Sequence, residues 1–304
     1  MHAMPFDLNL ERSILETISY TDQFQFPLST DEIYARLCNR TAEKCKKYSQ
    51  QEVADSLTEL IERKFLVQKK HSIALRHRES VFAHRLRRKK IADQKSEDVK
   101  QFLKAVSWIP WIQGIFVTGS LAMENTDEDD DLDFMIVTLP RRLWLTRFFV
   151  LIVAIFYGKR RSWHEKKHQG WCLNLWLDTK HLTVPREKRS MYQAYEVTQA
   201  KCVLSRNELE KKFVVENSWV LRYLPNSLLP HLSQNQHVHS KKHGGLFFDM
   251  IDYVAWKLQM YYMAPHKTSE RVARSFAFFH PRDTQHLVEE RWQQTLQKLY
   301  DNYS

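Results

Sequence analysis

The sequence predicts an α+β protein in which a small mixed sheet with flanking helices lies between a helix-rich N-terminal segment and a helical C-terminal region. Three apolar, β-branched or aromatic runs predict the strands of the sheet, at residues 115–118, 132–138 and 171–177. Apolar residues at helical spacing predict helices over most of the remaining chain. With 304 residues, of which 43% are hydrophobic and 12% aromatic, about two or three domains with real cores are expected.

The first seventy-odd residues predict three helices and a hairpin. Two capping-box patterns precede apolar runs at helical spacing, Ser29 with Glu32 and Ser49 with Glu52. Short strands are expected at 65–68 and 73–76. This order is typical of a winged helix-turn-helix domain, here residues 1–78. The outward face of its third helix is only weakly basic, so nucleic-acid binding and a protein-contact role remain equal alternatives.

Charge is unevenly distributed along a chain whose net charge is +10. Residues 63–90 contain eleven Lys or Arg and one acidic residue, and residues 141–167 contain eight basic residues and one glutamate. By contrast, residues 124–133 contain seven carboxylates. Two basic tracts around an acidic segment suit a protein that binds anionic ligands with the help of metal ions. Nucleic acid is one such ligand. Solvated helix faces are the alternative for either tract.

The sequence predicts a cytoplasmic protein without a membrane span. None of the four cysteines forms a metal-type C-x-x-C pair, and no secretory signal peptide is expected at the start of the chain. The apolar run 148–157 is about half as long as a spanning helix, so a buried core helix is expected there. An interfacial membrane contact is the second interpretation of this run.

Gly119 and Ser120 follow the first predicted strand directly. A glycine lets the backbone turn sharply off the strand and approach a phosphate closely. Ser120 adds a hydroxyl donor at the start of a predicted short helix, where amide groups also face an anion. These two residues are therefore expected to bind nucleotide phosphates.

Asp131 and Asp133 begin the second predicted strand. Side chains two residues apart on an extended strand leave the same face, with their carboxylates about 7 Å apart along the strand. Such a pair can share Mg²⁺ or Mn²⁺, which prefer oxygen ligands and substrate phosphates. A solvated acidic loop explains residues 124–130, but carboxylates entering an apolar strand are costly unless they are paired or bound to metal. Asp131 and Asp133 are therefore the expected metal ligands.

Val117-Thr118-Gly119-Ser120-Leu121-Ala122 followed by Asp131-Leu132-Asp133-Phe134 resembles the signature of the polymerase-beta-like nucleotidyltransferase superfamily. Over nearly its full length the chain is similar to bacterial nucleotidyltransferase-domain proteins with an N-terminal winged-helix-like segment. The resemblance implies a catalytic domain at residues 79–205, with a nucleotidyltransferase sheet, and a helical C-terminal domain at 206–304. It also implies metal-dependent transfer of a nucleoside monophosphate from an NTP, with release of pyrophosphate. Asp131 and Asp133 would hold the metals, and Gly119 and Ser120 would hold the β- and γ-phosphates.

The third strand departs from the family pattern. Active members carry a third carboxylate there, but this chain has Asn174, which ligates metal poorly and cannot act as a base. Asp178, at the same strand parity, is the expected catalytic substitute. Other candidates for the missing group are Glu124, Asp129, Asp130, His164 and His168.

Two functions of different classes follow from these residues. The leading one is a nucleotidyltransferase acting on a hydroxyl of a nucleic-acid end, a protein or a small molecule. The alternative, which Asn174 favours, is a catalytically weak regulatory or nucleic-acid-binding protein that senses nucleotide and metal. A structural adaptor ranks last because it leaves Asp131 and Asp133 unexplained.

Overall fold

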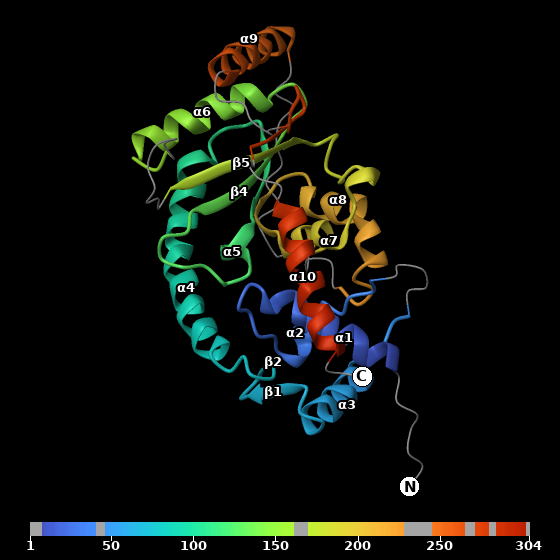
Figure 1. Ribbon diagram of the computed structural model, residues 1–304. Coiled ribbons are helices and arrows are strands. Elements are labelled where there is room, and N and C mark those ends of the chain that lie inside the picture. Colours follow the sequence, from blue (N-terminus) through green and yellow to red (C-terminus); the bar gives the residue numbers. More distant parts are fainter. Residues whose placement is uncertain are drawn as a thin grey trace.

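The computed structural model describes residues 8–40, 46–160, 170–227, 245–264, 271–279 and 284–301. As predicted, its architecture is mixed α/β. A six-stranded mixed sheet with the order β6-β3-β4-β5-β8-β7 forms its centre, and helices flank it (Figure 1). A separate two-stranded sheet lies in the N-terminal part.

The N-terminal residues form the expected order of elements: α1 (Leu8–Asp22), α2 (Thr30–Ala35), α3 (Gln50–Glu62), β1 (Leu66–Lys69) and β2 (Ser72–Leu75). Both predicted capping boxes are present, because Ser29 and Ser49 each bond reciprocally with the glutamate three residues later. These elements bury a core of their own around Ile14, Ile33 and Leu57.

A single long helix, α4 (Val81–Val106), leads into the central sheet. The predicted strands are observed as β3 (Ile112–Val117), β4 (Leu132–Thr138) and β5 (Trp171–Asp178). β3 pairs antiparallel with β4, and β4 pairs parallel with β5. The starts of β4 and β5 therefore lie at the same edge of the sheet, next to the end of β3.

The expectation that the last hundred residues are all helical is wrong. β7 (Arg271–Val272) and β8 (Phe276–Phe278) form a hairpin that pairs with β5. On the other side of the sheet, β6 (Lys201–Ser205) pairs with β3. The two strands of the hairpin hold too few residues to establish a period of two, so only their long-range hydrogen bonds define them.

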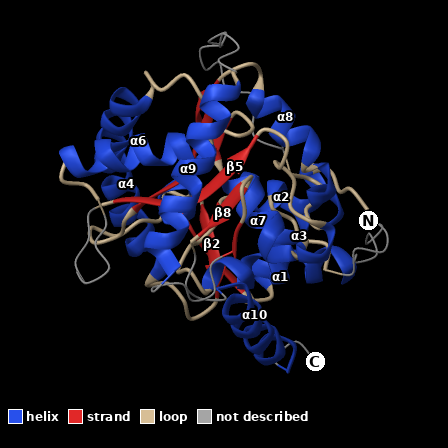
Figure 2. Ribbon diagram, turned by 90° about the horizontal axis from the view of Figure 1, so that it is seen from above, coloured by secondary structure: helices blue, strands red, loops and turns tan. Residues whose placement is uncertain are grey.

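The sheet separates two cores (Figure 2). One face packs against α4 and α6 (Leu143–Phe156), through residues such as Ile115, Phe134 and Ile136. The opposite face packs against α7 (Met191–Gln199), α8 (Leu209–Glu216) and α10 (Thr284–Asp301), through residues such as Met135 and Val137. The odd-numbered positions of β4 therefore face α7.

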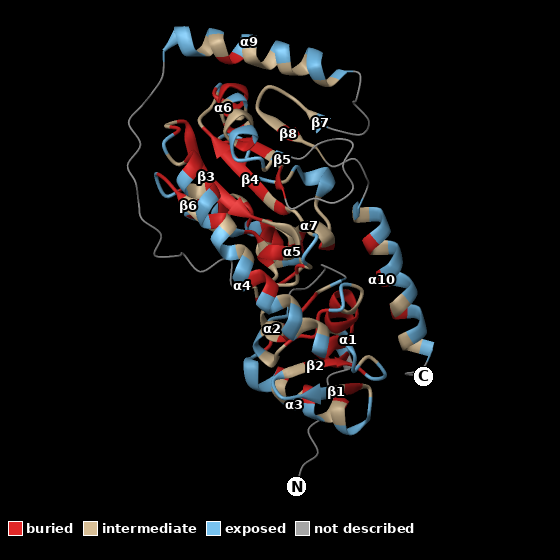
Figure 3. Cartoon of the chain, turned by 90° about the vertical axis from the view of Figure 1, so that its left-hand side faces the viewer, coloured by how far each residue is buried: buried red, intermediate tan, exposed pale blue. Residues whose placement is uncertain are grey.

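The C-terminal helix returns to the N-terminal elements. Trp292 of α10 is buried and donates from Nε1 to the backbone oxygen of Glu16 in α1 at 3.1 Å. Figure 3 shows α10 extending from the level of the sheet down to these elements. The contact connects the two ends of the chain.

Helix α6 differs from the expected fully buried core helix. Trp144, Val150 and Ala154 are buried on one face, but Phe148 is 47% exposed and Phe156 is 84% exposed. α9 (Leu246–Met263) packs along a further side of α6. None of the helices described is both long and apolar enough to cross a lipid bilayer.

Candidate functional site

The turn after β3 brings Gly119 against Asp133. Gly119 has a φ of +64°, in the left-handed region that favours glycine, and it begins the short helix α5 (Gly119–Ala122). A Cβ at this position would lie 2.5 Å from Asp133 Oδ2. The Thr118 amide donates to the backbone oxygen of Asp133 at 3.0 Å. Gly119 and Asp133, which are fourteen residues apart in the sequence, therefore lie side by side.

Asp131 and Asp133 flank the start of β4, and both remain partly exposed. Leu132 and Phe134 between and beside them are buried in the core on the α4 and α6 side, as the alternation predicts. Asp131 Oδ1 accepts a hydrogen bond from the Gly170 amide at 3.2 Å, which connects it to the start of β5. The two carboxylates thus lie on one edge of the sheet with access to solvent.

Asn174 of β5 also joins this cluster. Its Nδ2 donates to Asp133 Oδ1 at 3.3 Å, while its Oδ1 is buried and has no hydrogen-bond partner among the described residues. A buried amide oxygen without a donor is unusual in a folded protein and calls for an explanation, such as an ion or a water molecule. The structure therefore brings together Gly119, Asp133 and Asn174, while Asp131, two residues before Asp133, contacts the start of β5.

The prediction that Asp178 completes the site is corrected by the strand register. Asp133 pairs with Cys172, whereas Asp178 pairs with Thr138 at the opposite end of β4. The rise of a strand places Asp178 roughly 18 Å from the position beside Asp133. Its buried carboxylate instead accepts from the Lys180 amide and lies 2.7 Å from His181 Nδ1.

Asp130 organises the acidic loop that precedes β4. Its Oδ2 accepts hydrogen bonds from Ser120 Oγ at 2.9 Å, from the Asp127 amide at 2.9 Å and from Thr126 Oγ1 at 3.2 Å. The Ser120 hydroxyl is therefore already engaged inside the protein, and an incoming phosphate would compete for it.

The other acidic candidates, Glu124 and Asp129, lie in the segment between α5 and β4. Glu124 bonds to Lys89 and Lys201, and the hydrogen bond from Lys89 is the main cause that lowers the pKa of Glu124 to about 2. Asp129 is exposed. His164 and His168 lie outside the described residues.

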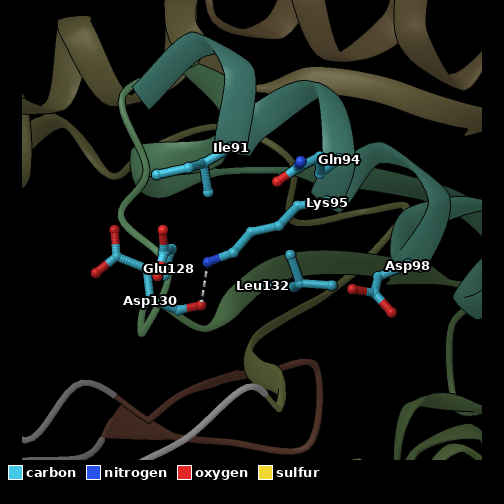
Figure 4. Close-up of a pocket in the computed structure, with 7 residues that line it drawn as sticks. All are labelled: Ile91, Gln94, Lys95, Asp98, Glu128, Asp130 and Leu132. Atoms are coloured by element: carbon cyan, nitrogen blue, oxygen red, sulfur yellow. Dashed lines mark hydrogen bonds between the residues drawn. The ribbon is translucent and has the colours of Figure 1, made fainter. Parts of the chain in front are cut away.

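Lys95 of α4 also bonds to the acidic loop before β4. Its Nζ donates to the backbone oxygens of Asp127 at 2.5 Å and Asp130 at 2.6 Å, and to Thr126 Oγ1 at 3.2 Å. Figure 4 shows its ammonium group directed at this loop across a cavity of about 300 Å³. Ile91, Gln94, Lys95, Asp98, Glu128, Asp130 and Leu132 line the cavity.

Replacing Lys95 with methionine is expected to lower the free energy of unfolding by about 1–3 kcal/mol, because three buried or half-buried oxygens lose their donor. Urea denaturation would measure the change. Lys89→Met removes an exposed pair with Glu124 and should cost less than about 1 kcal/mol. Equal losses in the two variants would contradict a special role of Lys95 in holding the loop.

Glu196 is the candidate that sequence reasoning missed. It is the single charged residue of α7, whose first turn is capped by Ser190 Oγ accepting from the Gln193 amide. Burial, and after it the negative charge of Asp133, raises the pKa of Glu196 to about 7. Its neighbours Tyr195 and Val197 are buried. A lone carboxylate in an otherwise uncharged, largely buried helix was the available signal.

The donor chemistry of this cluster suits a hard cation. Carboxylates at 131 and 133 and the unpartnered Asn174 Oδ1 are oxygen donors of the kind Mg²⁺ and Mn²⁺ prefer, and Mg²⁺ usually binds one or two carboxylates together with water and phosphate. Within the described ranges, no three His, Cys, Asp or Glu side chains converge closely enough to form a preformed metal site. The oxygen donors of Asp131, Asp133 and Asn174 are of a chemical kind that such a cation can accept.

Much of the first basic tract is paired within the protein. Arg87 and Arg88 form ion pairs with Asp127 of the acidic loop, and Arg78 and Arg85 pair with carboxylates of the N-terminal elements. The pairs of Arg87 and Arg88 join α4 to the loop before β4, and the pair of Arg85 joins α4 to α2. The part of the second tract at 161–167 lies outside the described residues. Nucleic-acid binding by the two tracts therefore stays a prediction.

No protein-family model, no curated protein and no solved structure matches the chain. The geometry of the cluster around Asp133 is therefore the basis for inferring a function.

Proposed function

We propose that the protein is a Mg²⁺-dependent or Mn²⁺-dependent nucleotidyltransferase that transfers a nucleoside monophosphate from an NTP to a hydroxyl acceptor and releases pyrophosphate. The observation that carries this proposal is the contact between Gly119 and Asp133, where a Cβ would lie 2.5 Å from the carboxylate. A phosphate can approach the backbone closely only where no side chain intervenes. The contact supports one site with a phosphate-binding turn beside acidic metal ligands.

Asp131 and Asp133 would hold the metal, and Asn174 Oδ1 is a further oxygen within the same cluster. When bound, the metal would neutralise charge on the triphosphate and help to orient it. Gly119 would bind the β- and γ-phosphates through its backbone. Ser120 would contribute its amide, since its hydroxyl already donates to Asp130.

Glu196 is the proposed general base. Burial disfavours the charged form of the Glu196 carboxylate and raises its pKa, which makes it a stronger base than an exposed glutamate. As the acceptor oxygen forms its bond to the α-phosphorus, the acceptor hydroxyl proton passes to the Glu196 carboxylate. The bond from the α-phosphorus to the bridging oxygen breaks, and pyrophosphate leaves.

Three classes of acceptor remain under this proposal: a nucleic-acid end, a protein side chain and a small molecule. The N-terminal elements have the order of a winged helix, which suits a nucleic-acid acceptor. However, α3 presents a polar outward face in which Gln51 bonds to Asp55, so it offers no strongly basic recognition surface.

A nucleotide and metal sensor is the second candidate function. The observation that favours it is the hydrogen bond from Asn174 Nδ2 to Asp133 Oδ1. An amide therefore stands where the third carboxylate is expected, and it already engages one oxygen of a proposed metal ligand. Such a site would bind nucleotide without efficient turnover.

The test is an assay with labelled ATP, CTP, GTP and UTP, each with Mg²⁺ and with total RNA, lysate protein or small-molecule extract as acceptor. Wild-type protein should label one acceptor class. The double variant Asp131→Asn/Asp133→Asn should reduce labelling at least about a hundredfold, because several kcal/mol of charge stabilisation is lost. Asp129→Asn, an exposed carboxylate of the same loop, is the matched control and should remain active.

Thermal unfolding with Mg²⁺ and NTP separates the two candidates. Stabilisation by nucleotide without any labelled product would favour the sensor. If labelling is the same in wild type and the double variant, and nucleotide stabilises neither protein, both candidates are wrong.

A further inference from the structure

Helix α9 exposes large apolar side chains along its length. Phe247, Met250, Val254, Leu258 and Tyr261 recur at three- and four-residue spacing and are between 50% and 84% exposed. Asp252 is the buried residue on its other side. Figure 3 shows α9 at one end of the molecule, with exposed surface along its length. This stripe of apolar side chains therefore faces outward.

Neighbouring helix α6 enlarges this surface. Phe148, Ile155 and Phe156 are 47%, 52% and 84% exposed, and α6 packs directly beside α9 (Figure 1). Contiguous apolar patches of soluble monomers rarely exceed a few hundred Å². Eight large apolar side chains are exposed on these two adjacent helices, so a partner for the surface is expected. We call these eight residues of α6 and α9 the apolar face.

Among the described residues of α6, of α9 and of the turn after α6, the exposed charged side chains are basic. Both carboxylates of α9 are turned inward: Asp249 pairs with Arg141 and Arg142, and Asp252 accepts from the Leu145 amide at the start of α6. Lys257, on the outward side of α9, is exposed. Arg160 is exposed at the other end and donates to Tyr262 Oη at 3.4 Å.

This charge pattern disfavours a second copy as the partner. A two-fold interface brings the same patch of both chains together, so Lys257 and Arg160 would approach basic residues of the other copy. Neither helix presents an outward carboxylate that could pair with them. An anionic partner with an apolar interior satisfies both features.

We propose that the apolar face of α6 and α9 docks on the surface of a membrane containing anionic lipids. Its aliphatic and phenyl groups would enter the acyl boundary, and Lys257 and Arg160 would lie at the headgroups. Tyr253, Tyr261 and Tyr262 suit this depth, because each has an apolar ring and a polar hydroxyl. The helices lie on the membrane and do not cross it.

The experiment is co-sedimentation of the full chain with vesicles of phosphatidylcholine alone and of phosphatidylcholine with phosphatidylglycerol. Wild type should bind the anionic vesicles, bind the neutral ones less, and dissociate as salt rises. Val254→Glu/Leu258→Glu should lower the partition coefficient on the order of tenfold or more, because two carboxylates enter the apolar contact. The matched control is Leu86→Glu/Val215→Glu, since both residues are exposed apolar positions on other helices.

Circular dichroism and sedimentation velocity complete the test. All variants should retain the wild-type helix content, and the wild type should sediment as a monomer without vesicles. Absence of binding to anionic vesicles, or equal binding by both double variants, overturns the proposal. A wild-type dimer that Val254→Glu/Leu258→Glu dissociates also overturns it, in favour of a second copy as the partner.

Discussion

Replacing Gly119 with alanine is expected to lower nucleotide transfer at least about a hundredfold, since displacing reacting groups by about 1 Å can have that effect. The new Cβ would lie 2.5 Å from Asp133 Oδ2, so the carboxylate must move away. The variant also places a non-glycine residue at a φ of +64°, which costs about 1–2 kcal/mol of stability. Labelling assays and urea denaturation measure the two effects.

Gly158 provides a matched control for this substitution. Its φ of +62° is nearly the same, but a Cβ there meets nothing within 4 Å. Gly158→Ala should therefore show a similar loss of stability and unchanged transfer. If both variants remain active, the contact between Gly119 and Asp133 has no part in catalysis.

Replacing Glu196 with glutamine is expected to change activity and stability in opposite directions. Loss of a general base lowers turnover by about a hundredfold to ten-thousandfold. The stability effect follows from the raised pKa of about 7, against an ordinary value of 4.5. The folded state binds this proton more tightly than the unfolded state, so stability is retained below pH 4.5 and falls as the pH rises to about 7.

Glu196→Gln should therefore be more stable than wild type at pH 8. The expected gain is about 1–2 kcal/mol, which is less than the full pKa shift implies, because solvent reaches part of the side chain. The difference should vanish near pH 4. Thermal unfolding in EDTA across this pH range measures it. Glu62→Gln, an exposed glutamate of α3, should show no such pH dependence. If the variant is inactive but not stabilised at pH 8, the pKa of Glu196 is not raised in the folded protein, and a positioning role would replace the role of general base.

Local patterns predicted the elements correctly wherever the determinants lie close together in the chain. The capping boxes at Ser29 and Ser49 use residues three apart, and both form as expected. The strand at 132–138 was predicted with its observed bounds because it is long and apolar. The turn at Gly119 was predicted from its position after a strand, and its positive φ agrees with that interpretation.

Register and partner strands could not be predicted in the same way. Strand parity made Asp178 a plausible neighbour of Asp133, but the pairing of Cys172 with Asp133 leaves Asp178 at the far end of β5. Such a pairing depends on hydrogen bonds between segments about forty residues apart, and no local periodicity encodes it. The same reason applies to β6 and to the hairpin of β7 and β8.

By itself, the sequence determined the mixed α/β class, the helical and strand segments with strong local signals, and the glycine turn and paired aspartates. These follow from side-chain periodicity, capping and backbone sterics, which act over a few residues. Only the tertiary structure decided that Asn174 contacts Asp133, that Asp178 lies at the far end of β5, and that the charge of Asp133 acts on Glu196 of α7. It also decided that the apolar stripe of α9 faces outward, because burial depends on which surfaces the rest of the chain covers.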